Sequence, residues 1–378
     1  MNWKMLGGFW QAVGSALIVL VLANVILHVV FSAWYPQSRG QRRTWEGFSD
    51  VRRAAYAGMT PAEVNDLLDW TWRRPGFVYE QQTSFHEAPR SSRFVNVSAQ
   101  GIRLTTGAES DLSKADLART VLLFGGSTMF GYGLSDGQTI AAHLQARLPQ
   151  YNFVNLGRAY YYSAQENIFL LRLLQSGHKI RYAAFLDGLN ERCDFVVYQP
   201  QLEQMFNEAQ VRRPAYAWDW KNQVVYPMRW LAARLRAKMF GEVEAPPVTL
   251  SARLHALDCS DYGNSIRLRD VTAQNMKARA ALCDAFGIAC VTFVQPFAGV
   301  NGLHLEESSL STAARRVVKA KYEELAPLWK ETGAIDISNA LDVLPKHAYV
   351  DNVHYSNEAS GIIAQKMLPA LSERFGWR

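Results

Sequence analysis

The sequence of 378 residues lacks the patterns that mark several common function classes. Its four cysteines form no C-x-x-C pair, which removes support for a zinc ribbon or a thioredoxin-type motif. Lys and Arg are scattered and give a net charge of only +6, without the dense basic stripe typical of nucleic-acid binders. We therefore expect no nucleic-acid partner, and we find no internal repeat and no low-complexity tract.

Metal-ligand spacing is also missing, so we expect neither a metal site nor a cofactor. The histidines interpreted as surface or core residues are His86, His143, His178, His255, His304 and His347.

The four cysteines leave the redox compartment open. Cys283 and Cys290 flank a predicted turn between a helix and a strand and could form a disulfide in an exported protein. Cys193 and Cys259 bracket a predicted insertion and could do the same. Four reduced, buried thiols are the alternative.

An almost wholly apolar run covers residues 9–34, with Trp10 and Trp34 at its two ends. About 20 such residues span a bilayer core of roughly 30 Å, and aromatic residues often lie at its two interfaces. A cleaved signal peptide is the rival interpretation, but no clean cleavage site follows the run. We expect an uncleaved transmembrane anchor.

The orientation of this anchor is less clear from charge. The flank with Arg39, Arg42 and Arg43 is more basic than the flank with Lys4, which favours a cytoplasmic C-terminal bulk. Large domains can translocate despite such charges. We expect a single-pass protein of a bacterial inner membrane with its main domain in the periplasm.

Three regions follow from the pattern: the anchor at 9–34, an aromatic-rich N-terminal extension at 35–118, and a main domain at 119–378. In the extension, Thr60-Pro61-Ala62-Glu63 predicts a capped helix start, followed by Trp70 and Trp72. Residues 94–97 alternate like a short strand.

From residue 121 onward, strand-like and helix-like segments alternate, which is typical of a mostly parallel sheet with helices on both faces. We expect strands at 121–124, 152–156, 182–186, 289–294 and 334–337, and helices at 138–148, 165–175, 271–286, 311–332 and 357–375. An insertion is expected at about 193–261.

The first of these strands ends in Gly125-Gly126-Ser127-Thr128. A glycine turn after a buried strand places the Ser127 hydroxyl at the carboxyl edge of the sheet, where ligands bind in open α/β folds. Ser127 is therefore a candidate nucleophile.

The loop before the closing helix contains Asp351-Asn352-Val353-His354. This spacing allows the carboxylate of Asp351 to hold one nitrogen of His354 and leave the other free as a base. A capped helix start with a solvated histidine is the structural alternative.

Two other strand ends carry hydrogen-bond donors. Gly157 follows the second strand, and Asn190 follows the third. With the N–H of Ser127, the N–H of Gly157 and the amide of Asn190 could surround a developing oxyanion. A turn glycine and a helix-capping asparagine are the alternatives.

In this order, the motifs around Ser127, Gly157, Asn190 and Asp351/His354 resemble the four blocks of the SGNH (GDSL-type) hydrolases. The resemblance covers about residues 119–375 and implies a flavodoxin-like three-layer α/β fold, here preceded by one N-terminal transmembrane helix. It implies Ser127 as nucleophile, His354 as base, Asp351 as orienting acid, and Gly157 and Asn190 as oxyanion donors.

Two residues depart from the family pattern. Gly126 stands where the family often has Asp, and Glu191 follows Asn190 where Asp is usual. The Gly-Gly-Ser-Thr form resembles divergent membrane-anchored bacterial members, some of which act on cell-envelope polysaccharides.

We therefore expect a serine esterase or deacylase that acts on an O-acyl ester, with an envelope glycan as a candidate substrate. An O-acyltransferase of such a glycan, or a non-catalytic glycan-binding or assembly protein, are the alternatives. Aromatic residues of the insertion could form a lid or a sugar-stacking wall, or pack a small core of their own: Tyr198, Phe206, Tyr216, Trp218, Trp220, Tyr226 and Trp230.

Overall fold

The computed structural model describes residues 44–73, 76–80, 82–191, 267–298, 300, 312–344 and 346–377, together with four isolated positions near the N-terminus. The predicted anchor lies almost wholly outside these residues, and the predicted insertion lies entirely outside them. Within the described ranges, we find no helix with the length and apolar character of a membrane span.

The main domain contains a five-stranded sheet in which every neighbouring pair is parallel. The sheet order is β4-β3-β5-β6-β7, so the chain winds outward in both directions from β3. The strands are β3 (Thr120–Gly125), β4 (Asn152–Asn155), β5 (Tyr182–Asp187), β6 (Ala289–Val294) and β7 (Ile335–Asp336). The predicted α/β fold with a mostly parallel sheet is confirmed.

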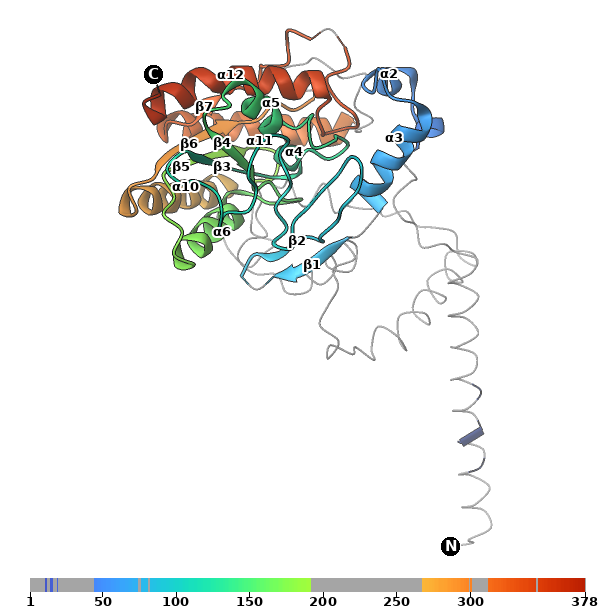
Figure 1. Cartoon of the computed structure of the whole chain (residues 1–378), viewed down its shortest axis with the longest axis horizontal. Coiled ribbons are helices and arrows are strands. Elements are labelled where there is room, and N and C mark those ends of the chain that lie inside the picture. Colours follow the sequence, from blue (N-terminus) through green and yellow to red (C-terminus); the bar gives the residue numbers. More distant parts are fainter. Residues whose placement is uncertain are drawn as a thin grey trace, which may run out of the picture. The chain divides into compact units, whose positions relative to one another are not determined.

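Helices connect these strands and cover both faces of the sheet (Figure 1). They are α4 (Ser127–Phe130), α5 (Ile140–Arg147), α6 (Ser163–Gln175), α10 (Leu268–Ala285), α11 (Thr312–Glu331) and α12 (Asn357–Phe375). Each predicted helix of the described region is present: α12 has the predicted ends, and the others are shifted by one to three residues at one or both ends. α4 is an additional short helix.

The alternation of side chains along each strand builds two apolar cores. Val121 and Leu123 point toward α5 and α12, whereas Leu122 and Phe124 point toward α6 and α10. All four side chains are almost completely buried. Burial on both faces explains why β3 is a continuous apolar run rather than an alternating one.

The segment before β3 belongs to the same compact unit as the sheet. Its elements are η1 (Trp45–Gly47), α2 (Asp50–Ala54), α3 (Pro61–Leu68), the π-helix η2 (Asp69–Arg73) and an antiparallel hairpin of β1 (Phe77–Glu80) and β2 (Ser84–Glu87). The predicted helix start is confirmed: the Thr60 side chain and the Glu63 carboxylate form a reciprocal capping box.

The strand predicted at 94–97 does not form. Only Val97 makes isolated bridges, to Arg90 and Arg103. Local polar groups compete for the backbone here, because Asn96 N–H donates to Asp136 Oδ1 at 3.2 Å. The alternation of this segment instead reflects a buried Val95 and Val97 beneath an irregular surface loop.

Candidate active site

The candidate nucleophile Ser127 begins the short helix α4, directly after the turn that ends β3. The residue is half-buried, whereas Thr128, Met129 and Phe130 behind it are buried. The Thr128 hydroxyl donates to Gln295 Oε1 at 3.1 Å, which ties α4 to the end of β6. The serine is therefore held on a fixed turn with one side open.

The position of Ser127 follows from the strand order. β3 and β5 are neighbours whose connections leave toward opposite faces of the sheet, and such a switch point is where open α/β folds bind ligands. Ser127 follows β3 and Asn190 follows β5. Both predicted residues therefore lie at the same crevice-forming edge.

Asp351 and His354 are brought together by a tight loop. His354 Nδ1 lies 2.8 Å from Asp351 Oδ2 and 3.0 Å from Asp351 Oδ1. The backbone N–H groups of Val353 and His354 also donate to Asp351 Oδ1, each at 2.8 Å. These donors favour a charged carboxylate that fixes the imidazole with its Nδ1 as the hydrogen-bonded nitrogen.

The loop itself is anchored at both ends. Val350 N–H donates to the His354 carbonyl at 2.8 Å, and Ser356 N–H donates to the Ala348 carbonyl at 2.9 Å. The Tyr355 hydroxyl donates to the Pro296 carbonyl at 2.7 Å, just beyond β6. His354 is thereby placed at the carboxyl edge of the sheet, the edge that carries Ser127.

The second nitrogen of the histidine, Nε2, is buried and has no hydrogen-bond partner among the described residues. The Ser127 hydroxyl is thus not hydrogen-bonded to it in this structure. Hydrogen bonds of acyl-transfer sites are often long before substrate binds. Because Asp351 holds Nδ1, the Nε2 atom of the same ring can accept a proton as a general base.

Asn190 lies against the turn that carries Ser127. Its Nδ2 donates to the Tyr161 carbonyl at 2.8 Å, and a Cβ built on Gly126 would overlap this nitrogen. An amide nitrogen carries two hydrogens, so one N–H remains after the bond to Tyr161. Asn190 therefore has a donor in contact with the residue before the nucleophile.

Gly157 follows β4, and its N–H donates to Asn155 Oδ1 at 3.0 Å in this structure. Its role as an oxyanion donor stays a prediction. A side chain at Gly157 would overlap the backbone of Met129 and Phe130 in α4. The lack of a Cβ at Gly157 therefore permits close packing of α4 on the loop after β4.

Glu191, one of the two departures from the family pattern, is buried and holds the neighbouring loop. Its Oε2 accepts from the Ser163 hydroxyl at 2.7 Å, and its Oε1 accepts from the Ser163 N–H at 3.2 Å. Asn190 and Glu191 thus clamp one loop at two points, Tyr161 and Ser163. The longer side chain of Glu reaches a partner 28 residues away in sequence.

Glu191 also belongs to a buried group of carboxyls that shares one cation, Arg279. The guanidinium of Arg279 contacts Asp187 at 2.5 Å and Glu166 at 2.9 Å. Burial, reinforced by the charge of Asp187, raises the pKa of Glu191 to about 7 and raises the pKa of Glu166 well above its usual value. Both shifts favour the neutral forms of these carboxyls, because the buried surroundings disfavour net charge.

Two aromatic side chains that the sequence did not single out as site residues surround His354. The ring of Trp72 lies 4.9 Å from the imidazole at an interplanar angle of 70°, and the ring of Tyr132 lies 5.5 Å away. The only signal in the sequence was Trp72 itself, two residues after Trp70 and close behind the capped helix. Its large separation from His354 along the chain gave no reason to join the two.

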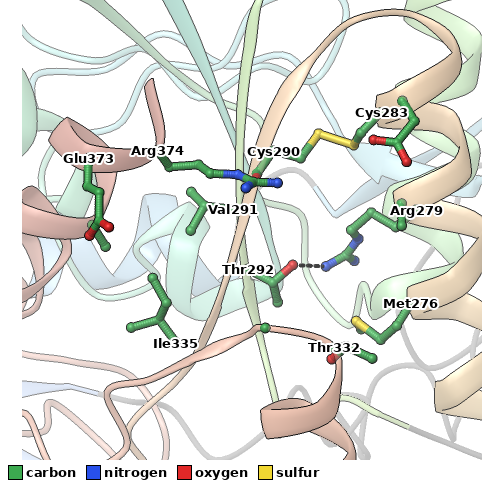
Figure 2. A pocket seen from close by; sticks show the side chains of 14 residues that line it. Met276, Arg279, Cys283, Cys290, Val291, Thr292, Thr332, Ile335, Glu373 and Arg374 are labelled. Carbon is green, nitrogen blue, oxygen red and sulfur yellow. Dashed lines mark hydrogen bonds between the residues drawn. A yellow bond between two sulfur atoms is a disulfide. The ribbon is translucent and has the colours of Figure 1, made fainter. Parts of the chain in front are cut away.

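A pocket of about 550 Å³ lies elsewhere, beside the first half of β6. Figure 2 shows its lining, which includes Arg279, Thr292 and Arg374 and the disulfide between Cys283 and Cys290. β7 pairs with Phe293 and Val294, and within the described ranges the first half of β6 has no strand neighbour on that side. The pocket is therefore at the opposite end of β6 from the edge that carries Ser127.

Among the described residues, no group of three or more His, Cys, Asp or Glu side chains is arranged to hold a metal ion.

Comparison with known proteins gave similarities at the level of structure. No family model and no curated protein matches the chain. A lipolytic protein of the G-D-S-L family from Veillonella parvula is 12% identical and has a TM-score of 0.37, with 66% of this chain and 96% of that chain covered.

Two other solved structures give similar values. TesA is 16% identical with a TM-score of 0.37, and 68% of this chain and 99% of that chain are covered. The acetyl xylan esterase AlAXEase is 11% identical with a TM-score of 0.36, and 66% and 98% are covered. The first of the three structures bears the name of the family that the sequence motifs resemble.

Proposed function

We propose that this chain is a serine hydrolase of the SGNH type that cleaves O-acyl esters, with Ser127 as nucleophile, His354 as general base and Asp351 as orienting acid. The observation that carries the proposal is the Asp351–His354 pair. Its carboxylate accepts hydrogen bonds from two backbone N–H groups and lies within 2.8 Å of Nδ1, while Nε2 has no hydrogen-bond partner among the described residues. A carboxylate whose charge is stabilised by hydrogen bonds can orient an imidazole without taking its proton.

The reaction starts when His354 Nε2 removes the proton of Ser127 Oγ and Oγ attacks the ester carbonyl carbon. The carbonyl oxygen becomes an oxyanion, which the N–H of Ser127 and the second N–H of Asn190 Nδ2 stabilise. Nε2 then donates the proton to the departing alcohol oxygen as the ester C–O bond breaks. An acyl-serine remains.

The acceptor of the acyl group decides between two outcomes. Attack by water, with Nε2 again as base, releases a carboxylic acid and restores the serine. Attack by a sugar hydroxyl would make the protein an O-acyltransferase. We propose hydrolysis as the basic reaction and a cell-envelope glycan ester as the candidate substrate.

A fluorophosphonate probe and p-nitrophenyl acetate test the proposal on the full-length protein. We expect the probe to modify Ser127, as located by peptide mass spectrometry, and the ester to be hydrolysed. Ser127→Ala should abolish labelling and lower kcat by at least ~10³-fold. Ser113→Ala, an exposed serine before β3, is the matched control.

An unlabelled Ser127 together with no turnover would refute both enzyme functions and favour the non-catalytic glycan-binding alternative. Acyl transfer to an added oligosaccharide at the expense of hydrolysis would identify the transferase instead.

We propose further that residues 9–34 anchor the chain in the bacterial inner membrane with the hydrolase domain in the periplasm. The disulfide between Cys283 and Cys290 supports an oxidising compartment. Fusions of alkaline phosphatase or green fluorescent protein to the C-terminus test this orientation. Active phosphatase is expected, and fluorescence without phosphatase activity would reverse the orientation.

A further inference from the structure

Two side chains, Trp72 and Tyr132, form an aromatic wall beside the candidate base His354, and Trp72 comes from the segment before β3. Trp72 contacts both His354, at a ring distance of 4.9 Å, and Tyr132, at 4.7 Å. Tyr132 lies 5.5 Å from the same imidazole. Two rings therefore pack beside the histidine, one from the N-terminal segment and one from the loop after α4.

The backbone that delivers Trp72 is unusual. α3 ends at Leu68 and continues directly as the π-helix η2 over Asp69–Arg73. π-helical turns are rare and occur frequently at functional sites, since they change the direction in which side chains leave the helix. The Thr71 hydroxyl donates to the Leu67 carbonyl at 2.7 Å and helps to satisfy this turn.

A buried carboxyl holds the wall in place. Glu87, in β2, lies with Oε1 2.6 Å from the Ala159 N–H and 3.3 Å from the Tyr132 hydroxyl. Burial raises the pKa of this fully buried group, which favours its neutral form. Glu87 thereby joins the N-terminal hairpin to the loops after α4 and after β4.

A third contact joins the segment before β3 to the loop that carries Asp351 and His354. Arg52 Nη2, in α2, donates to Asn352 Oδ1 at 2.9 Å, between Asp351 and His354 in the chain. The segment thus contacts three of the loops that form the carboxyl edge of the sheet. The side chain of His354 is only 10% exposed as a result of this packing.

We propose that Trp72 is a positioning residue for His354: its ring keeps the imidazole shielded and Nε2 directed to the serine side of the site. This inference rests on the proposed function for its kinetic consequence, but the shielding itself does not. Asp351 fixes Nδ1 alone, and a ring held at one atom can still tilt. The aromatic wall removes that freedom.

Chemical modification of His354 tests the shielding without any need for activity. Diethyl pyrocarbonate modifies accessible neutral imidazoles, and peptide mass spectrometry of the full-length protein resolves the individual histidines. In Trp72→Leu we expect His354 to react several-fold faster, with His143 in α5 unchanged. Trp72→Phe should restore most of the protection, because it keeps an aromatic ring.

The control is Trp70→Leu, because Trp70 is another partly buried tryptophan that packs on the same apolar cluster. It should leave the reactivity of His354 unchanged. If Trp72→Leu has a lower urea midpoint than Trp70→Leu, Trp72→Met replaces it. Equal reactivity of His354 in the wild type and Trp72→Leu, or an equal rise in Trp70→Leu, would overturn the proposal.

Kinetics then separate positioning from substrate binding. Trp72→Leu should lower kcat about ten-fold with little change in KM, and shift the acidic limb of the pH profile, since aromatic contacts of this size correspond to about that factor. A higher KM with unchanged kcat and pH profile would make Trp72 a substrate contact and refute the positioning role. Absence of Ser127 labelling in the wild type refutes the hydrolase alone, since the modification assay still decides on Trp72.

Discussion

Buried carboxyl groups occur in two very different surroundings in this molecule. Asp351 accepts two backbone N–H groups and its own histidine, each within 3.0 Å. Glu166, Asp187 and Glu191 instead cluster about a single cation, Arg279. The first arrangement favours a charged carboxylate, whereas burial in the second raises the pKa values of Glu166 and Glu191.

The difference shows what makes a buried acid useful. Backbone N–H groups do not titrate, and the hydrogen bonds that they donate favour the charged form of the Asp351 carboxylate. In the cluster around Arg279, burial instead raises the pKa values of Glu166 and Glu191. The ion pairs and hydrogen bonds of this cluster join β5, α6 and α10.

The strongest test of this contrast is Asp351→Asn. The amide keeps the shape of the side chain but offers an NH₂ group where Nδ1–H needs an acceptor, so the wrong imidazole tautomer is favoured. We expect kcat to fall about 10³–10⁴-fold, with the urea midpoint nearly unchanged. A fall of less than ten-fold would remove Asp351 from the site.

Arg279→Met should affect stability rather than chemistry. It leaves three buried carboxyls without their cation, and loss of one partner of a buried ion pair destabilises by about 3–5 kcal/mol. Urea unfolding at pH 7 measures this change. Arg269→Met is the control, because the exposed pair with Glu331 at 3.5 Å should contribute no more than about 1 kcal/mol.

Glu191→Gln should change how stability depends on pH. With a pKa of about 7 in the fold against 4.5 for the exposed group, the native state holds more protons than the unfolded state between these values. The free energy of unfolding of the wild type therefore falls as pH rises from about 5 to 8, by about 3 kcal/mol through this group.

The neutral amide cannot titrate, so the free energy of unfolding of Glu191→Gln should rise relative to that of the wild type as pH increases from about 5 to 8. Urea unfolding at pH 5, 6, 7 and 8 gives the comparison, with Glu331→Gln, an exposed glutamate, as the control that should follow the wild type. Parallel curves for wild type and Glu191→Gln would show that Glu191 is not the titrating group.

A smaller effect is expected from Gly126→Ala. The added Cβ would overlap Asn190 Nδ2, so the amide must shift away from the nucleophile turn. Full loss of one oxyanion donor lowers kcat about 10²-fold or more. A displaced donor should lower kcat by roughly ten-fold. Unchanged kcat would place Asn190 outside the oxyanion site.

Local chemistry made much of the fold and part of the site predictable. The apolar run of β3 and the glycine turn placed Ser127, and three residues of spacing sufficed to join Asp351 to His354. The capped start of α3 was equally local. In each case the interacting groups lie within a few positions of one another.

The remaining features depend on contacts between distant segments. Trp72 and Glu87 contact the site from segments that are distant in sequence, and the spacing of apolar residues does not predict such contacts. The hairpin of β1 and β2 was missed for a related reason, because its strands have only four residues each and little alternation. The hydrogen bond from the Gly157 N–H to Asn155 Oδ1 was likewise not predicted, because the position of Gly157 at a strand end does not show which acceptors lie near it.

The close approach of Asn190 to Gly126 has a consequence for how this site can change over generations. A Cβ at position 126 would lie 2.3 Å from Asn190 Nδ2, so the terminal amide of Asn190 must shift whenever a larger residue replaces this glycine. A lineage that acquires a side chain before the nucleophile therefore also needs a new position for this amide, and the two positions constrain each other's substitutions.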